Sequence, residues 1–459
     1  MCGILCCIIR SSDQKSIDDI ISRLQSLQDD LERRGPDSHN AILCPLGENL
    51  WLFMYSTVLW LQGSHVCSQP LKDEKENLLQ WNGDIYYANL HLHPWEGLEL
   101  SKSDIEELSF RVEEKCIPQH IKNDLNRDIP MPERLPTIHP SDVVFSQLLA
   151  DPLFISAVEN LETLLKMAVS VRARTHPGVC KNCLELQECT HTKVAILFSG
   201  GVDSGVLASL CHEFVGNNET IDLINVAFHQ KNSDEANAVP DRITGLSCFQ
   251  ELEKIHPGRW NFVKVDVDKE RLVDKRKSHV RHLIYPCNTV LDDGIGCALW
   301  FAGLGEGVLL NGESYKSPAR VLMVGMGADE QLCGYSRHRE RFKSDGWLGA
   351  IQEIENQVTG MWKRNMGRDD RILSDHGRQA RFPYLDSRVV SFLHSLPVWV
   401  KADFRQPRGI GEKMILRLLA HRLGLHSTAR LPKRAIQFGS RIAKLEDRKE
   451  KGSDACPRL

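Results

Sequence analysis

The alternation of apolar and polar positions divides the chain into two regions. Over residues 1–90, short apolar runs alternate with residues typical of turns, as in CGILCCIIR, ENLWLFMYSTVLWLQG and ENLLQWNGDIYYANL. This period of two predicts an antiparallel β unit. From Lys193 onward, helix-length segments separate four apolar runs, VAILF, IDLINVAF, WNFVKVDV and RVLMVGM. Strands that alternate with helices predict an α/β fold in which helices cover both faces of a parallel sheet.

A proline-rich connector separates the two regions. Its irregular pattern contains one helical patch, at residues 103–112. After the connector, the apolar residues of 156–174 have clear helical spacing. The end of the chain is rich in charge, and we expect it to be exposed and poorly ordered. The predicted organisation is a β domain over 1–95, a connector over 96–150, an α/β domain over 151–445 and a charged tail over 446–459.

Composition narrows the class of protein. The chain has 459 residues, enough for two domains, and 42% hydrophobic with 26% charged residues are ordinary values for a soluble globular protein. A net charge of −4 gives no overall attraction to nucleic acid, so we expect small-molecule substrates instead. No apolar run is long enough to span a membrane, and MCGILCCIIR is too short for a signal peptide. Fifteen cysteines, mostly in apolar segments, favour buried thiols and a cytoplasmic location.

The most informative stretch is VAILFSGGVDS, from Val194 to Ser204. It predicts a strand, a glycine-rich turn and an apolar helix. Adjacent glycines let the backbone approach an anion, and the unpaired N–H groups at a helix start bind phosphate. Serine hydroxyls add donors, and the carboxylate of Asp203 suits Mg²⁺. The same pattern would also suit a turn that uses glycine only for packing.

No Walker motif surrounds this stretch. S-G-G-x-D-S instead resembles the pyrophosphate loop of the N-type ATP pyrophosphatases, which split ATP between its α and β phosphates and adenylate their substrate. By itself the motif leaves asparagine synthetases, argininosuccinate synthetase, GMP synthetase and tRNA-modifying ligases open.

Four downstream motifs discriminate among these enzymes. GMGADEQLCGY, LSDHGRQARFPYLD, RGIGEKMILR and LPKRAIQFGSR occur in order between Gly325 and Arg441. Together with the glycine-rich loop they resemble the synthetase half of glutamine-dependent asparagine synthetase. Within that family, VLDDGIGCALWFA and LPKRAIQFGSRIAK resemble the asparagine synthetase domain-containing proteins most closely.

The resemblance implies roles for individual residues. ATP would lie against both glycine-rich loops, with Mg²⁺ held by Asp203 and Asp329. Lys433 would be catalytic by stabilising the oxyanion that forms when an acyl-adenylate is attacked, although a solvated surface lysine would leave the same trace in the sequence. The residues implied for ATP are Leu197, Ser199, Gly200, Gly201, Asp203, Ser204, Val226, Gly325 and Gly327.

Two departures weaken the link to aspartate as the acyl substrate. Gln379 stands where the family usually has glutamate, so a charge that could hold a metal or act as a base is missing. Asp292 and Asp293 stand where the family places threonines and an arginine near its amino-acid substrate. Unless they are paired, these carboxylates would repel aspartate.

The N-terminal region resembles the amino-terminal-nucleophile glutaminase domain of class II amidotransferases. Cys2 followed by Gly3 matches the nucleophile, whose own α-amino group would act as base once Met1 is removed. Arg34 begins an RGPD segment implied in glutamine binding, and Asn82 with Gly83 would form the oxyanion hole. The domain is shortened, and Val58 replaces an arginine that grips the substrate carboxylate, so glutamine hydrolysis is weakly supported.

A second cluster of chemistry-bearing residues precedes the first strand of the α/β domain. Cys180, Cys183, Cys189 and His191 form a C-x2-C-x5-C-x-H pattern, which could close a tetrahedral zinc site. A cysteine-rich linker with reduced thiols, or a pair for redox or persulfide chemistry, would leave the same pattern.

These observations support three hypotheses. The first is an ATP-dependent, AMP-forming amide ligase that resembles asparagine synthetase and takes nitrogen from ammonia or glutamine. The second is a catalytically reduced relative that binds nucleotide and acts through protein contacts. The third is a tRNA-modifying ATP pyrophosphatase that uses Cys180 and Cys183.

Overall fold

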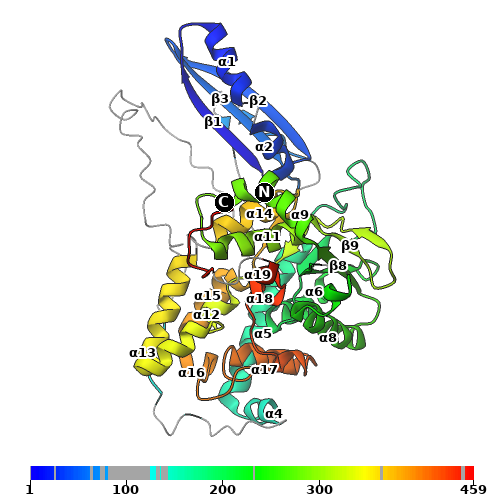
Figure 1. The fold of residues 1–459 in the computed structure, drawn as a ribbon, viewed down its shortest axis with the longest axis vertical. Coiled ribbons are helices and arrows are strands. Elements are labelled where there is room, and N and C mark those ends of the chain that lie inside the picture. Colours follow the sequence, from blue (N-terminus) through cyan, green and yellow to red (C-terminus); the bar gives the residue numbers. More distant parts are fainter. Residues whose placement is uncertain are drawn as a thin grey trace.

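A mostly parallel, seven-stranded sheet forms the centre of the computed structural model, with strand order β10-β9-β8-β7-β6-β11-β12 (Figure 1). The structure describes residues 2–24, 27–61, 66–72, 78–80, 125–130, 135, 143–230, 233–361, 365–445 and 450–459. The strands of this sheet are β6 (Val194–Leu197), β7 (Ile221–Phe228), β8 (Trp260–Val267), β9 (Glu306–Val308), β10 (Ser314–Lys316), β11 (Val321–Met323) and β12 (Gln379–Arg381). The predicted α/β class and all four predicted strands are confirmed, whereas the antiparallel edge strands β9 and β10 were not predicted.

Helices pack on both faces of this sheet, because its buried strands are apolar on both sides. One face is covered by α5 (Pro152–Arg174), α6 (Val202–Cys211), α8 (Pro240–Ile255), α15 (Ser387–Ser395) and α17 (Met414–Arg422). The other face is covered by α9 (Lys269–Lys275), η4 (Arg276–Val280), α10 (Arg281–Ile284), α11 (Val290–Leu304), α14 (Gly367–Ser374) and α19 (Ile442–Leu445). The remaining helical elements of this domain are α4 (Val144–Leu149), η3 (His212–Phe214), α7 (Ser233–Asn237), α12 (Ala328–Gln331), α13 (Ser336–Met361), η6 (Pro383–Leu385), α16 (Val398–Lys401), η7 (Thr428–Arg430) and α18 (Ile436–Gly439).

The order of the parallel strands determines where a ligand site can form. The chain builds β6, β7 and β8 outward in one direction and then returns to the other side of β6 to build β11 and β12. The strand order therefore reverses between β6 and β11. In open α/β sheets, ligands bind in the crevice at the carboxyl ends of the strands at such a switch point.

A separate antiparallel sheet forms the N-terminal region, in the order β1-β3-β2 (Figure 1). Its elements are β1 (Gly3–Arg10), α1 (Gln14–Leu24), α2 (Gln28–Arg34), β2 (Ser38–Gly47) and β3 (Leu50–Val58), followed by the two-residue strands β4 (Leu71–Lys72) and β5 (Leu78–Leu79). The antiparallel β unit is confirmed here, but the two helices between β1 and β2 were not predicted. Ile17 of α1 is buried against Ile9 and Phe53, so the helices cover one face of this sheet.

The N-terminal sheet docks on the α/β domain through the segment that follows α2. The Asp37 carboxylate accepts a hydrogen bond from Arg320 Nη1 at 2.8 Å, and both side chains are almost fully buried. Arg33 Nε pairs with Asp375 at 2.8 Å, and Pro36 contacts Gly377. Arg320 and Gly377 precede β11 and β12, so docking occurs at the amino ends of the strands.

The C-terminal segment is ordered where the structure describes it, in contrast to the poorly ordered tail that the charge pattern predicted. Ala455 pairs with Thr289, and the N–H groups of Val290 and Leu291 donate to carbonyls of this segment. Leu459 packs partly into the core beside α11. The segment is held because it supplies hydrogen-bond acceptors to the start of α11. Among the described residues, no helix has the length and apolar character that crossing a membrane requires.

Candidate functional site

Two glycine-rich loops meet at the switch point. Gly200, after β6, has φ +73°, and an added Cβ would lie 2.3 Å from the Thr244 carbonyl, so only glycine fits there. Gly327, after β11, has φ +92°, and its added Cβ would lie 2.3 Å from Leu385. A Cβ on Gly325 would lie 3.0 Å from Asp203, so the loops are in direct contact.

A buried lysine joins the acidic residues of both loops. Lys413 Nζ lies 2.7 and 2.6 Å from the two carboxylate oxygens of Asp203 and 2.6 Å from Asp329 Oδ1. Lys413 is completely buried and precedes α17 in a left-handed conformation, φ +56°. Because an unpaired charge is costly in such a place, Lys413 and the two carboxylates must be treated as one unit.

Lys433 completes this unit from the LPKR segment. Its Nζ forms an ion pair with Asp329 Oδ2. Although burial acts in the opposite direction, Lys413 and Lys433 hold the pKa of Asp329 well below its ordinary value. Burial lowers the pKa of Lys433, but the neighbouring carboxylates of Asp329 and Asp203 raise it further, so that the pKa lies above its ordinary value. Both groups are therefore charged at neutral pH.

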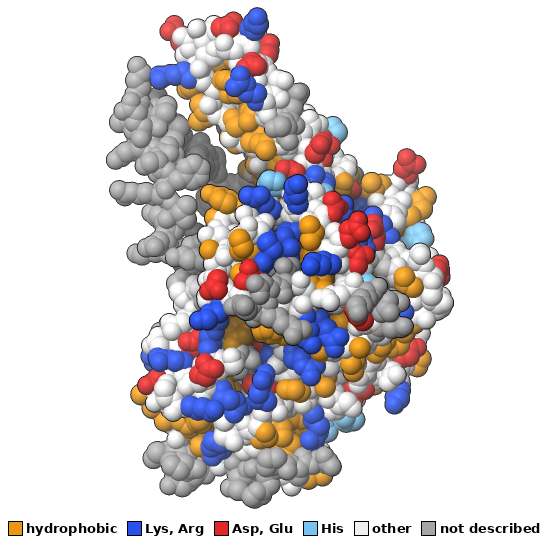
Figure 2. Space-filling model, in the orientation of Figure 1, with side chains coloured by type: hydrophobic (Ala, Val, Ile, Leu, Met, Phe, Trp, Pro, Cys, Tyr) orange, Lys and Arg blue, Asp and Glu red, His pale blue; other side chains and the backbone are white. Residues whose placement is uncertain are grey.

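The pocket beside this unit is small and polar, with about 40 Å³ of space for water-sized molecules. Lys and Arg side chains gather across the middle of the face shown in Figure 2, over the region where Figure 1 draws α17 and α18. This local positive charge suits an anionic ligand, although the net charge of the whole chain is −4. The lining residues are Ser199, Gly201, Val202, Asp203, Asp241, Thr244, Lys413, Arg417, Leu431, Pro432, Lys433 and Arg434.

Most residues implied for ATP lie in or beside this pocket. Ser199 and Gly201 line it, and Gly201 is the N-cap of α6. Ser204 is buried in the first turn of α6, and its hydroxyl donates to the Gly201 carbonyl at 3.2 Å. Leu197 and Val226 are half-buried near the carboxyl ends of β6 and β7, and they pack toward the other face of the sheet.

Sequence reasoning missed four charged residues that line this pocket. Lys413 and Arg417 lie in the RGIGEKMILR motif, Arg434 follows Lys433 in the LPKR segment, and Asp241 lies at the start of α8. Burial raises the pKa of Asp241 to about 7, and the nearby Lys433 and Arg434 only partly counteract it. The lysine within the motif was a signal for Lys413, but a single lysine before an apolar helix reads equally well as a surface residue.

The acids that were expected to disturb aspartate binding are paired. Asp292 caps α11 through Thr289 and forms an ion pair with Arg368 at 2.5 Å. Asp293 is buried and forms an ion pair with Arg276 at 2.8 Å. Because both carboxylates are paired with arginines, they would not repel an anionic substrate.

Gln379 lies away from the pocket. It begins β12, where it pairs with Val321 at the amino end of the sheet. Its Oε1 accepts a hydrogen bond from Arg381 Nε at 2.5 Å. The replacement of glutamate by Gln379 therefore removes no charge from the pocket, contrary to the expectation of a lost metal ligand or base.

The residues implied in glutamine hydrolysis are only partly described. Cys2 is half-buried at the start of β1, and its neighbour Gly3 donates a backbone hydrogen bond to Thr57 Oγ1 at 3.0 Å. Arg34 Nη2 lies 3.5 Å from Asp370 of the α/β domain. Asn82, Gly83 and the predicted helical patch at 103–112 lie outside the described residues.

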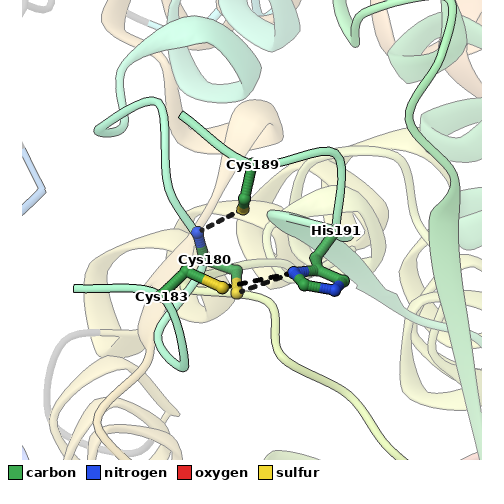
Figure 3. A group of neighbouring side chains, drawn as sticks. All are labelled: Cys180, Cys183, Cys189 and His191. Carbon is green, nitrogen blue, oxygen red and sulfur yellow. Dashed lines mark hydrogen bonds between the residues drawn. The ribbon is translucent and has the colours of Figure 1, made fainter. Parts of the chain in front are cut away.

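The Cys/His cluster predicted from the sequence is assembled in the structure (Figure 3). The ligand atoms of Cys180, Cys183, Cys189 and His191 all lie within 4.8 Å of one another. His191 Nδ1 lies 3.3 Å from Cys183 Sγ and 3.7 Å from Cys180 Sγ, and the Cys180 N–H donates to Cys189 Sγ at 3.2 Å. Burial raises the pKa of Cys180 to about 11, with the neighbouring thiols adding to the effect.

The cluster and the pocket lie at opposite ends of the sheet. The cluster precedes the first residue of β6, whereas the glycine-rich loop follows the last residue of that strand. Sulfur on Cys180 or Cys183 therefore lies at the end of the sheet opposite to the pocket. This arrangement disfavours the hypothesis in which these cysteines pass sulfur to an adenylated tRNA.

Comparisons with known proteins agree with the motifs. No family model matches the chain. It is 50% identical over 311 residues to asparagine synthetase domain-containing protein 1 of Mus musculus, covering 60% of this chain and 50% of that protein. It is 45% identical over 366 residues to the Homo sapiens protein of the same name, covering 70% of this chain and 57% of that protein. It is 24% identical over 239 residues to glutamine-hydrolysing asparagine synthetase of Gallus gallus, covering 52% and 37% of the two chains.

The chain thus spans about half the length of the curated relatives it matches. The prediction is confirmed: the chain is a homologue of the asparagine synthetase domain-containing proteins and, more distantly, of the asparagine synthetases.

Proposed function

We propose that the pocket at the switch point binds Mg²⁺ and ATP and activates a carboxylate for amide formation, as an AMP-forming ligase of the asparagine-synthetase type. The observation that carries this proposal is the position of Lys413, whose Nζ lies 2.6 Å from carboxylate oxygens of both Asp203 and Asp329. Two acids from different loops converge there on one positive charge, beside the N-terminus of α6.

The donor set fits the proposed ligands. Carboxylate oxygens of Asp203 and Asp329 pair with Lys413 and Lys433 in this structure, and they would hold Mg²⁺ after these lysines move toward the phosphates. Mg²⁺ would supply charge neutralisation to the phosphates. The Ser199 hydroxyl and the N–H groups at the start of α6 would bind the pyrophosphate. Lys413 and Lys433 would counter the negative charge on the phosphates, and Lys433 would also stabilise the oxyanion of the attacked acyl-adenylate.

Aspartate as the acyl substrate, and ammonia or glutamine as the nitrogen source, are proposed from kinship. They accord with the pairing of Asp292 and Asp293, which leaves neither carboxylate uncompensated. Glutamine as the source would require Cys2 to act as a nucleophile.

A second candidate function is nucleotide binding without ligation. It is favoured by the pairing of Asp203 and Asp329 with Lys413, because both carboxylates that would hold Mg²⁺ already have a counter-charge. Mg²⁺ would bind only after Lys413 moves away from these carboxylates. A protein that retained the fold but in which Lys413 no longer moved would bind partners without turnover.

One assay separates these two functions. The purified chain is incubated with ATP, Mg²⁺, aspartate and ammonium, and pyrophosphate, AMP and asparagine are measured. We expect all three products, and a loss of about 100-fold or more in Asp203→Asn, which keeps the shape of the side chain but removes its charge. Asp222→Asn is the control at the other end of the sheet, because Asp222 is a completely buried aspartate and is the second residue of β7, at the amino end of the strands.

The possible results are distinct. Pyrophosphate that forms equally with and without aspartate would retain ATP cleavage between the α and β phosphates and refute aspartate as the substrate. ATP binding without pyrophosphate would favour the second function, and equal rates in wild type and Asp203→Asn would refute the site. Replacement of ammonium by glutamine tests Cys2, because Cys2→Ala should reduce asparagine formation only in that condition.

A further inference from the structure

The loop between α5 and β6 has no regular secondary structure to hold it. From Thr175 to Lys193 it contains neither helix nor strand. Its apolar residues contribute little to the core, because Leu184 and Leu186 are exposed and only Val179 and Cys180 are completely buried. A loop of this length without its own packing usually has a function or an additional constraint.

Four side chains in this loop that could bind zinc lie close enough together to surround one ion. Bond lengths of about 2.3 Å to sulfur and about 2.0 Å to nitrogen place the S and N ligands of a tetrahedral site roughly 3.6 Å apart. The distances from His191 Nδ1 to Cys183 and Cys180, 3.3 and 3.7 Å, match this value (Figure 3). A metal bound there would complete the set with Cys189, without a large movement of the backbone.

The charges around the cluster suit a metal–thiolate centre. Three thiolates with one Zn²⁺ carry a net charge of −1, so nearby cations stabilise the complex. Lys193 Nζ donates to the Cys189 carbonyl at 2.7 Å, and Arg320 Nη2 donates to the Cys180 carbonyl at 3.4 Å. The N–H···S hydrogen bond from Cys180 to Cys189 is of the kind that supports a metal-bound sulfur.

The same loop forms part of the seat for the N-terminal sheet. Arg320 contacts the loop at the Val179 and Cys180 carbonyls and, through its other nitrogens, contacts Asp37 and Trp60 of the N-terminal region. The backbone N–H of Lys181 also donates to Pro318, just before β11. The position of Arg320 therefore depends on the loop.

We propose that Cys180, Cys183, Cys189 and His191 bind one structural Zn²⁺, and that the metal-bound loop fixes Arg320 in the position in which it docks Asp37 of the N-terminal sheet. All four ligands come from the protein, which leaves no open position for substrate, as in other structural zinc sites. This proposal is independent of the proposed ligase function, because the cluster lies at the opposite end of the sheet from the pocket.

Metal analysis of the purified whole chain tests the proposal. We expect one zinc per chain in wild type and a loss of zinc in Cys183→Ser and His191→Ala. His191→Cys is the conservative variant and should retain zinc, since four cysteines also form structural sites. Cys44→Ser is the matched control, because Cys44 is half-buried like Cys183 but lies on β2. Cobalt in place of zinc should give the visible absorption of a tetrahedral thiolate complex in wild type and in Cys44→Ser.

Chelation of the wild-type chain avoids the problem of a variant that does not fold. Removal of zinc should increase hydrogen exchange at the amides of Lys181 and Asp37, and added zinc should reverse it. Three results would each overturn the proposal. The wild-type chain contains no zinc after purification with zinc present, or it contains a disulfide between Cys180 and Cys183. Alternatively, Cys183→Ser binds as much zinc as wild type. Zinc loss without a change in exchange at Asp37 would overturn its docking role.

Discussion

The pocket and the Cys/His cluster occupy opposite ends of one sheet and are assembled in opposite ways. The pocket and the ion-pair unit beside it draw Asp203, Asp329, Lys413 and Lys433 from four segments that lie far apart in the sequence. The cluster draws all four of its ligands from one loop. A site assembled from distant segments depends on the whole fold, whereas a local cluster can be read from spacing alone. The difference predicts that single changes at the pocket have wide consequences and changes at the cluster have local ones.

The largest effect is expected from removal of the lysine that joins the two loops. Lys413→Met leaves Asp203 and Asp329 facing each other without the cation between them. Breaking a buried ion pair in this way costs about 3–5 kcal/mol, and pyrophosphate release should fall below detection. Unfolding in denaturant and the pyrophosphate assay measure the two effects.

Lys401→Met is the matched control for this change. Lys401, the last residue of α16, is equally buried but does not line the pocket. Its Nζ donates to the Leu393 carbonyl at 2.8 Å. Its variant should lose some stability but retain pyrophosphate release at a temperature where it is folded. If both variants lost activity in proportion to stability, Lys413 would have no role beyond folding.

The next effect concerns the junction beside the cluster. Asp37→Ala leaves the fully buried Arg320 without its carboxylate, so docking of the N-terminal sheet should weaken by about 3 kcal/mol. Asp370→Ala removes a partly exposed ion pair with Arg34 across the same junction and should cost less than about 1 kcal/mol. The backbone amide of residue 37 donates to the Val58 carbonyl. Hydrogen exchange at this amide measures the weakening of docking in both variants. Equal effects would show that docking does not depend on Arg320.

A smaller, pH-dependent effect is expected from Asp241 at the pocket. Its pKa is 3.8 in an ordinary environment and about 7 in the folded chain, because burial disfavours the charged form. Between these values the folded protein retains a proton that the unfolded chain has released, so the free energy of unfolding falls as pH rises. The slope from this one group is at most about 1.4 kcal/mol per pH unit.

Asp241→Asn removes this contribution. The stability of the variant relative to wild type should therefore increase as pH is raised from 5 toward 7. Denaturant unfolding at several pH values measures the difference. Parallel stability curves for the two proteins would contradict the raised pKa of Asp241.

The smallest effect is expected from Gln379→Glu, which restores the residue that the family usually has. Because Gln379 lies at the amino end of β12, pyrophosphate release should change by less than about twofold, and the new carboxylate would still pair with Arg381. A large change in activity would place this residue in the reaction and break the separation between the two ends of the sheet.

Several features could be predicted from the sequence because their signals are local. The apolar runs at 221–228 and 260–267 coincide with β7 and β8, since a mostly apolar run of this length is typical of a strand inside a parallel sheet. The Cys/His spacing gave the cluster for the same reason. The helix α1 was not predicted, although Ile17, Ile20, Ile21 and Leu24 have helical spacing. The stronger period of two in the flanking runs led to a β prediction for the whole region.

The amino-acid sequence by itself determined the α/β class, the glycine-rich loops, the cluster and the kinship with asparagine synthetase domain-containing proteins. Only the tertiary structure decided that Lys413 joins Asp203 to Asp329, that Asp292 and Asp293 are paired, and that Gln379 lies away from the pocket. The physical reason is that spacing along the chain fixes periodicity and local turns. Which charge is neutralised by which partner depends instead on strand order, which brings distant segments to one end of the sheet.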